Sequence, residues 1–267
     1  MRTLTLPEGL TATVEEPAQP AARPPVLFVH GMFGGAWYFE KFQRCFAAHG
    51  YPSYAINLRG HHDSRPVHDI GTVSVRDYVD DTRLALGAIR RAPDGALPIV
   101  IGHSMGGLIA QKVAEAGAVS AAVLLCAAPP RGISVLSRSL LALAPRFGPA
   151  IVRSRALYPR PEDAARLVFN RTPAAEQRAL FDRFAPESGR AAREMAFSLI
   201  PVDAAKVRCP VLSVAAADDR MVLPRVGRRI ARKYHARHEE FPERGHFLVW
   251  EPGWEAVAEQ VACWLEA

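Results

Sequence analysis

The chain has 267 residues, of which 49% are hydrophobic and 22% are charged, values that are ordinary for a globular protein. This length suits one large α/β domain with an inserted segment, and it allows a sizeable core. The formal net charge is +6, but the arginines are scattered among alanines and acids along the chain. We therefore expect no nucleic-acid binding, which requires a concentrated basic surface.

The N-terminal residues lack the apolar run of a secretory signal, and no later run is long enough to cross a bilayer. These features predict a cytoplasmic protein without stable membrane insertion. Cysteine spacing indicates no metal site and no disulfide framework, and three of the four cysteines lie in apolar stretches. Buried free thiols are therefore expected for Cys45, Cys126, Cys209 and Cys263. The oligomeric state is not determined by these patterns.

Apolar runs typical of strands alternate with amphipathic runs typical of helices over most of the chain, after an N-terminal stretch that resembles an antiparallel edge pair. The expected strands are 25–29, 51–58, 97–101, 121–126, 210–216 and 237–241. The expected helices are 37–49, 75–91, 105–116, 224–234 and 254–265. This alternation predicts an α/β fold with a doubly wound, mostly parallel sheet, whose ligands bind beyond the carboxyl ends of its strands.

The segment 131–206 interrupts this alternation. It contains no convincing strand and has the pattern of short amphipathic helices separated by prolines. Because it is inserted between two expected core strands, we predict a helical lid or cap over the carboxyl edge of the sheet. Residues 1–130 and 207–267 then form the core domain. The alternative is a second packing layer far from the site.

The sequence Gly102-His103-Ser104-Met105-Gly106 follows a buried strand and opens a helix. This G-x-S-x-G pattern predicts a nucleophile elbow, a sharp turn that exposes the serine oxygen above the sheet. The N-terminus of the following helix favours negative charge at the same place. Ser104 is therefore the expected nucleophile.

A serine nucleophile needs a histidine base and a carboxylate that orients it. His246 lies in the loop after the last expected strand, where it can reach the elbow, whereas His235 ends a helix and His238 lies in a strand. The acid is expected after strand 210–216, where Asp218 and Asp219 are adjacent. We predict Asp219 as the acid, with Asp218 as the alternative.

These motifs, in this order, resemble those of the α/β-hydrolase superfamily, in its serine-nucleophile branch of esterases and lipases. The resemblance covers nearly all of the chain outside the lid. It implies an oxyanion hole made by the backbone N–H groups of Met32, in the segment His30-Gly31-Met32, and of Met105. Phe33 is the alternative for the first donor. The family's acid usually lies in a Gly-x-x-Asp turn, and this chain lacks that glycine, which keeps Asp218 open.

A second group of polar residues follows strand 51–58. His61, His62 and Asp63, with His68 and Asp69 nearby, resemble a set of metal ligands. Adjacent loop histidines point in different directions, however, and no helical spacing supports a site. We therefore predict no metal, and the proposed chemistry needs no cofactor.

The combined motifs predict a carboxylesterase that cleaves small-molecule esters of small to medium apolar acyl groups through an acyl-enzyme intermediate. The expected pocket residues are Phe33, Leu140, Phe147 and Phe169. A lactonase, a thioesterase or a carbon–carbon bond hydrolase would use the same three catalytic residues. A ligand receptor with slow or no turnover is the alternative from another class.

Overall fold

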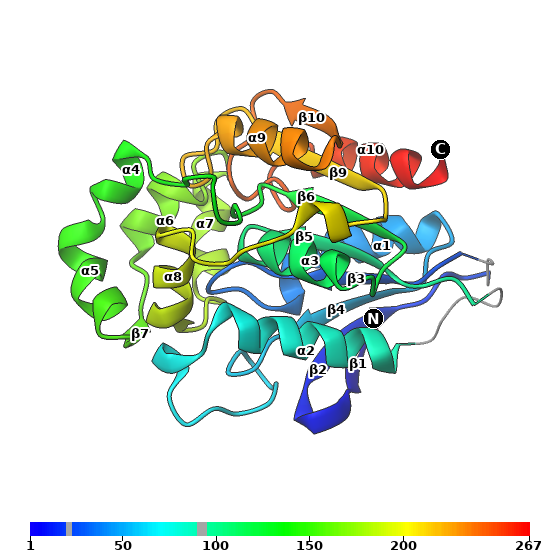
Figure 1. Cartoon of the computed structure of the whole chain (residues 1–267), viewed down its shortest axis with the longest axis horizontal. Helices are drawn as coiled ribbons and strands as arrows, with labels where there is room; N and C mark the ends of the chain where they lie inside the picture. Colours follow the sequence, from blue (N-terminus) through cyan, green and yellow to red (C-terminus); the bar gives the residue numbers. More distant parts are fainter. Residues whose placement is uncertain (20–22, 90–94) are drawn as a thin grey trace.

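The computed structural model describes residues 1–19, 23–89 and 95–267 of the chain (Figure 1). Its main sheet has eight strands in the order β1-β2-β4-β3-β5-β6-β9-β10. All neighbouring pairs from β4 to β10 are parallel, and β1 and β2 form the expected antiparallel edge. The predicted doubly wound, mostly parallel sheet is thereby confirmed.

The strands have the following bounds: β1 Arg2–Thr5, β2 Thr11–Glu15, β3 Val26–Val29, β4 Ser53–Asn57, β5 Ile99–His103, β6 Ala121–Leu125, β9 Val211–Ala216 and β10 Arg237–Phe241. Strand β5 begins and ends two residues later than expected, so it continues to the residue before Ser104. Strands β3, β5 and β6 are buried along their whole length, since helices cover both faces of a parallel sheet.

The core helices have the following bounds: α1 Glu40–Ala48, α2 Val75–Ala88, α3 Met105–Glu115, α9 Pro224–Tyr234 and α10 Trp254–Glu266. Helix α2 begins at a capping box, in which Ser74 and Asp77 each bind the other's backbone N–H. Residues 90–91, where this helix is predicted to end, lie outside the described residues. Helices α1 and α10 pack on one face of the sheet, and α2, α3 and α9 pack on the other.

The residues between β6 and β9 form a group of short helices at the left of Figure 1. These are α4 Arg138–Leu141, α5 Ala144–Val152, α6 Pro161–Leu167, α7 Ala174–Phe181 and α8 Gly189–Ala196. The expectation of a segment without strands is wrong, because β7 Ala156–Leu157 pairs with β8 Glu187–Ser188. Strands of two residues are too short to show an alternating pattern.

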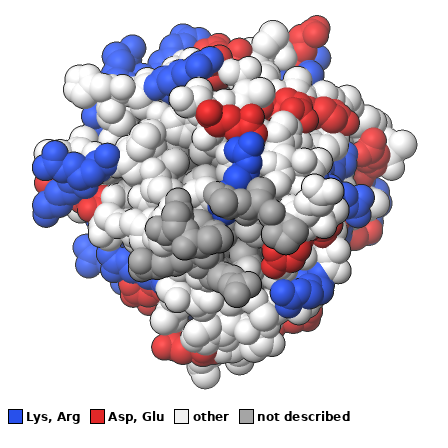
Figure 2. All heavy atoms as spheres, turned by 90° about the vertical axis from the view of Figure 1, so that its right-hand side faces the viewer, with Lys and Arg blue, Asp and Glu red and all other residues white. Residues whose placement is uncertain are grey.

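Figure 2 shows a face on which groups of Lys and Arg side chains and groups of Asp and Glu side chains are scattered among uncharged residues. This mixing is what the scattered arginines of the sequence predict for a solvated surface. In the described part of the chain, no helix has the length and apolarity required to span a membrane.

Candidate active site

Ser104 occupies the turn between β5 and α3 with backbone angles of φ 54° and ψ −116°. A non-glycine residue is strained at positive φ, and only the surrounding packing maintains it there. The flanking glycines allow that packing. A Cβ atom on Gly102 would lie 2.1 Å from the carbonyl oxygen of Gly106, and one on Gly106 would lie 2.0 Å from that of Val29. The strand and the helix therefore meet too closely for any larger residue.

His246 and Asp219 form a buried hydrogen-bonded pair. His246, in the loop after β10, lies with Nδ1 2.8 Å from Oδ2 of Asp219, in the loop after β9. The other carboxylate oxygen accepts the backbone N–H groups of Met221 and Val222 at 2.8 and 2.9 Å. These bonds fix the carboxylate, which in turn holds the proton of the imidazole on Nδ1. Among the described residues, Nε2 of His246 has no partner, so it is available as a proton acceptor.

The His246 loop is attached to the elbow through His103, the residue before Ser104. Nε2 of His103 donates to the carbonyl oxygen of His246 at 2.7 Å, and the two rings are 4.8 Å apart. Burial lowers the pKa of His103 to about 3, so this ring is neutral. His103 thus packs beneath the elbow and aligns the loop that carries the candidate base.

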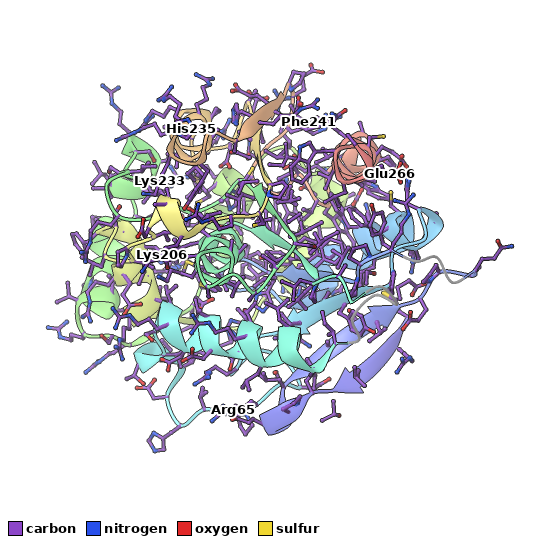
Figure 3. All side chains as sticks on the ribbon, turned by 45° about the vertical axis from the view of Figure 1, so that its right-hand side comes forward. Arg65, Lys206, Lys233, His235, Phe241 and Glu266 are labelled. Atoms are coloured by element: carbon purple, nitrogen blue, oxygen red, sulfur yellow. The ribbon has the colours of Figure 1, made fainter. Side chains whose placement is uncertain are left out.

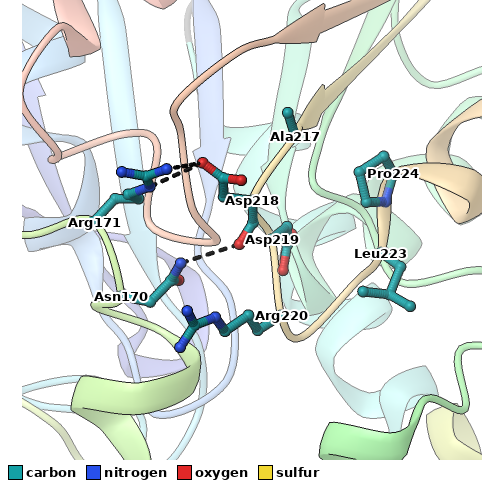
Figure 4. Close-up of a pocket in the computed structure, with 8 residues that line it drawn as sticks. All are labelled: Asn170, Arg171, Ala217, Asp218, Asp219, Arg220, Leu223 and Pro224. Carbon is teal, nitrogen blue, oxygen red and sulfur yellow. Dashed lines mark hydrogen bonds and ion pairs between the residues drawn. The ribbon is translucent and has the colours of Figure 1, made fainter.

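Asp218 points away from His246. Its carboxylate accepts a hydrogen bond from Nε of Arg171 at 2.8 Å, and Figure 4 shows the two side chains facing each other. They lie at a polar surface pocket of about 480 Å³. The residues that line this pocket are Asn170, Arg171, Ala217, Asp218, Asp219, Arg220, Leu223 and Pro224. The two adjacent aspartates therefore have different surroundings, and Asp219 is the one that contacts the histidine.

The loop after β3 lies directly against the nucleophile. A Cβ atom on Gly31 would lie 2.9 Å from Cβ of Ser104, so the next N–H group in the chain, that of Met32, is close to the elbow. Neither Met32 N–H nor Met105 N–H has an acceptor among the described residues. Phe33 N–H, in contrast, donates to the Glu187 carboxylate at 3.2 Å. Of the two alternatives for the first donor, Met32 is the one whose N–H remains available.

Glu187 is a buried acid that the sequence patterns did not indicate. Besides Phe33 N–H, its carboxylate accepts bonds from Nε2 of His61 at 3.2 Å and from the Tyr78 hydroxyl at 2.7 Å. The backbone N–H of the next residue, Ser188, which caps α8, also donates to this carboxylate at 2.7 Å. Glu187 and His61 are 126 residues apart, so no local motif joins them. Only the tertiary structure brings this acid of the inserted segment to the loop beside the elbow.

The geometry and the directions of the two pKa shifts favour an ion pair between His61 and Glu187. Nδ1 of His61 faces the carbonyl oxygen of Arg59 at 3.1 Å, so both ring nitrogens face acceptors and both donate. Burial opposes the charge of His61, but the Glu187 carboxylate, the Arg59 carbonyl and the Asp81 carboxylate together outweigh it and raise the His61 pKa. Burial likewise opposes ionisation of Glu187, yet the charge of His61 and the donated bonds lower its pKa. His62, the adjacent loop histidine, packs instead against Gly35.

The four expected pocket residues have different positions. Phe33 is partly exposed, and its ring stacks on Phe184 at 6.0 Å. Phe169 has no exposed surface and packs against Phe184 and Phe247 with ring centroids 5.3 Å away. Phe169 therefore packs beneath the other aromatic rings and has no surface that a substrate could contact. The expectation that it lines a pocket is wrong. Leu140 and Phe147 are partly buried on α4 and α5 of the inserted segment.

The parallel sheet, the elbow at the end of β5 and the His–Asp pair at the ends of later strands define the class of α/β-hydrolase fold proteins. A family model described as "Alpha/beta hydrolase family" matches residues 26–260. The chain therefore belongs to the α/β hydrolase family.

Solved structures share this fold over nearly the whole chain. A monoacylglycerol lipase of Paleococcus ferrophilus superposes with a TM-score of 0.72 at 22% identity, covering 96% of this chain and 98% of its own. MenH from S. aureus gives 0.72 at 18% identity, with 96% and 97% covered. A lipase-esterase related protein of Clostridium acetobutylicum gives 0.69 at 18% identity, with 96% and 98% covered. Among curated proteins, a sequence search finds no significant match.

Proposed function

We propose that this α/β hydrolase is a serine esterase that cleaves carboxylic esters of small to medium apolar acyl groups. The observation that carries the proposal is the buried hydrogen bond of 2.8 Å between Nδ1 of His246 and Asp219, beside the strained turn of Ser104. That bond selects the imidazole tautomer in which Nε2 accepts a proton, which a general base requires.

In the proposed mechanism, the Ser104 hydroxyl attacks the ester carbonyl carbon while His246 accepts its proton. Asp219 stabilises the imidazolium that forms, and the N–H groups of Met32 and Met105 bind the oxyanion. Each such donor contributes on the order of 10²–10³ to the rate. His246 then gives the proton to the departing alcohol. Water, activated by the same histidine, attacks the acyl-enzyme, releases the carboxylic acid and restores the serine.

An apolar acyl group suits the surface of the inserted segment. Within the described part of the chain, seven large apolar side chains are exposed, and all except Met1 lie between residues 131 and 206. These six are Leu136, Leu141, Val152, Tyr158, Phe197 and Leu199. We propose that this segment acts as the lid over the site and that Phe33, with Leu140 and Phe147, contributes apolar surface to the substrate. The names of two structural neighbours, a lipase and a lipase-esterase related protein, support an ester substrate.

The test is hydrolysis of p-nitrophenyl esters with acyl chains from C2 to C12. Wild type, Ser104→Ala and the control Ser134→Ala, which alters an exposed serine of the inserted segment, are measured in parallel. We expect the Ser104 variant to lose several orders of magnitude in kcat, since catalytic groups that act as a unit fail together. The control should have the kcat of wild type. The acyl-chain length that is cleaved fastest should report the size of the acyl pocket.

Labelling with a fluorophosphonate probe tests whether Ser104 is a reactive nucleophile, independently of which substrate the enzyme cleaves. If no ester turns over but the probe labels wild type and spares Ser104→Ala, the nucleophile is active and the substrate is a lactone, a thioester or a carbon–carbon bond. If neither esters nor the probe react, the esterase proposal is wrong and a ligand receptor takes its place.

A further inference from the structure

Helices α1 and α10 pack against each other and bring a cysteine, a histidine and a glutamate together at their surface. Cys45 and His49 are four residues apart, and His49 N–H still bonds to the Cys45 carbonyl at 3.1 Å, so the helical turn includes both. Their side chains therefore share one face of the helix. Glu259, from the middle of α10, reaches both of them. All four cysteines are free, but the expected burial holds only at Cys126, because Cys45 and Cys209 are partly buried and Cys263 is exposed.

The distances between the three side chains suit a small metal ion. Sγ of Cys45 lies 3.5 Å from Oε1 of Glu259, and Nε2 of His49 lies 2.8 Å from Oε2 of the same residue. One ligand atom from each residue lies within 4.8 Å of the other two. Zinc binds sulfur at about 2.3 Å and nitrogen or oxygen at about 2.0–2.2 Å, which separates tetrahedral ligands by about 3.3–3.7 Å. Small side-chain rotations therefore suffice to place an ion among them.

A second carboxylate orients the histidine. Nδ1 of His49, the nitrogen on the far side of the ring, lies 3.4 Å from Oε1 of Glu266. Metal-binding histidines usually donate this second N–H to a carboxylate, which leaves the other nitrogen for the metal. Glu266 is itself held by Arg23 at 2.9 Å. Figure 3 shows Glu266 at the C-terminal end of α10, beside α1.

We propose that Cys45, His49 and Glu259 form a surface site for a divalent transition metal of the zinc class, with water as the fourth ligand. Thiolate, imidazole and carboxylate together favour Zn²⁺ over Mg²⁺ or Ca²⁺, which prefer oxygen ligands alone. On binding, the Cys45 thiol and Nε2 of His49 each lose a proton to solvent, and the ion replaces the hydrogen bond between His49 and Glu259. One thiolate and one carboxylate neutralise the two charges of the ion. The site joins α10 to α1.

Cysteine spacing does not reveal this site, because only one of its ligands is a cysteine. The helical spacing of Cys45 and His49 is the signal in the sequence, and the third ligand comes from a helix more than 200 residues away. One other group of similar composition exists among the described residues, and it consists of Cys126, Asp219 and His246. It coincides with the candidate catalytic pair, so a metal bound there would inhibit the enzyme. The experiment must separate these two locations.

The test is titration of the full chain with Co²⁺, whose thiolate charge-transfer absorption in the near ultraviolet reports a bound cysteine. Wild type is compared with Cys45→Ser, His49→Gln and the control Cys209→Ser, a partly buried cysteine outside the cluster. We expect one equivalent of Co²⁺ with the thiolate band in wild type and in the control. The band should be lost in Cys45→Ser, and affinity should fall at least 10-fold in His49→Gln.

Thermal unfolding provides a second readout. Zn²⁺ at about 100 times the wild-type Kd should raise the Tm of wild type and the Cys209→Ser control by roughly 5 °C, and should raise the Tm of His49→Gln by no more than about half as much. A band that persists in Cys45→Ser but disappears in Cys126→Ser would locate the metal at the catalytic pair and overturn the proposal. The absence of any Co²⁺ band or Zn²⁺-dependent Tm shift in wild type would also overturn it. Neither readout depends on esterase activity.

Discussion

Two buried histidine–carboxylate pairs among the described residues look alike and differ in what they can do. In one, His246 bonds to Asp219 at 2.8 Å, and in the other His61 bonds to Glu187 at 3.2 Å. The difference lies in the second ring nitrogen. Nδ1 of His61 faces a backbone carbonyl and Nε2 faces the Glu187 carboxylate, so acceptors occupy both ring nitrogens. Nε2 of His246 has no partner among the described residues, so this ring can accept a proton.

The two carboxylates also differ in what they connect. The second oxygen of Asp219 accepts two backbone N–H groups of its own loop, which keeps the acid in place. Glu187 joins its own segment to Tyr78 of α2 and to Phe33 beside the elbow. A buried histidine–carboxylate pair is therefore a candidate for catalysis only where one nitrogen remains available, and a structural connection where both nitrogens are used.

The largest expected effect comes from the acid of the first pair. Asp219→Asn should lower kcat for ester hydrolysis by about 10⁴, because the amide stabilises the wrong imidazole tautomer. The matched control is Asp218→Asn, which removes the same charge one residue earlier and disrupts only an exposed pair with Arg171. That control should retain kcat within a factor of two. Equal losses in the two variants would contradict the assignment of Asp219.

Removal of the carboxylate from the second pair should mainly affect stability. Glu187→Gln leaves a buried imidazolium without its counter-charge, which costs about 3 kcal/mol and should lower the Tm by roughly 6 °C. Any loss of kcat in the remaining folded protein should stay below 10-fold. Urea unfolding measures the change, with Glu176→Gln, an exposed acid of the same inserted segment, as the control. A Glu187→Gln/His61→Gln double variant should lose less than the two single changes combined.

The second pair should also make stability depend on pH in two directions. The raised pKa of His61 means that its contribution is complete below its ordinary pKa of 6.5 and disappears as the pH rises through the raised value. The lowered pKa of Glu187 means that its contribution is complete above 4.5 and disappears as the pH falls through the lowered value. Subtracting the Tm–pH curve of the double variant from that of wild type should give a maximum between these limits. A flat difference curve would show that the pair is uncharged.

The smallest expected effect concerns Glu251, a buried carboxyl that supports the His246 loop by accepting Gly245 N–H at 2.7 Å. Burial raises its pKa from 4.5 to about 7, so folding favours the protonated form. The benefit of that protonation is complete below pH 4.5 and is lost as the pH rises to about 7. Glu251→Gln should therefore stabilise the protein at pH 8 by about 2 kcal/mol after allowance for solvent screening, and by little at pH 4.

The glutamine can keep the contact of the carboxyl with Gly245, because its side-chain oxygen also accepts that N–H. Its amide then takes the place of Oε1, which has no hydrogen-bond partner among the described residues. The control is Glu243→Gln, which removes the same charge from an exposed position of the same loop. Tm measured from pH 4 to pH 8 should flatten only in the Glu251 variant. If both variants give the same curve, the carboxyl is ionised throughout and the pKa shift is wrong.

Local patterns in the sequence were sufficient for the sheet and the elbow. The continuous apolar runs of the central strands indicate burial on both faces, and glycines on either side of Ser104 indicate a turn in which two segments meet closely. The bounds of α9 and β10 also follow from periodicity and from the proline at the start of the helix. These features depend on residues close in sequence, so a short stretch contains the information that determines them.

Contacts between distant segments were decided only by the tertiary structure. Periodicity could not separate Asp218 from Asp219, because their side chains differ only in the direction in which they point. That direction depends on the segments that pack against the loop. The pairing of Glu187 with His61, the burial of Phe169 and the meeting of Cys45 with Glu259 have the same origin. Each requires two segments that are far apart in the chain to pack together, and a side chain's charge and exposure depend on that packing rather than on its sequence neighbours.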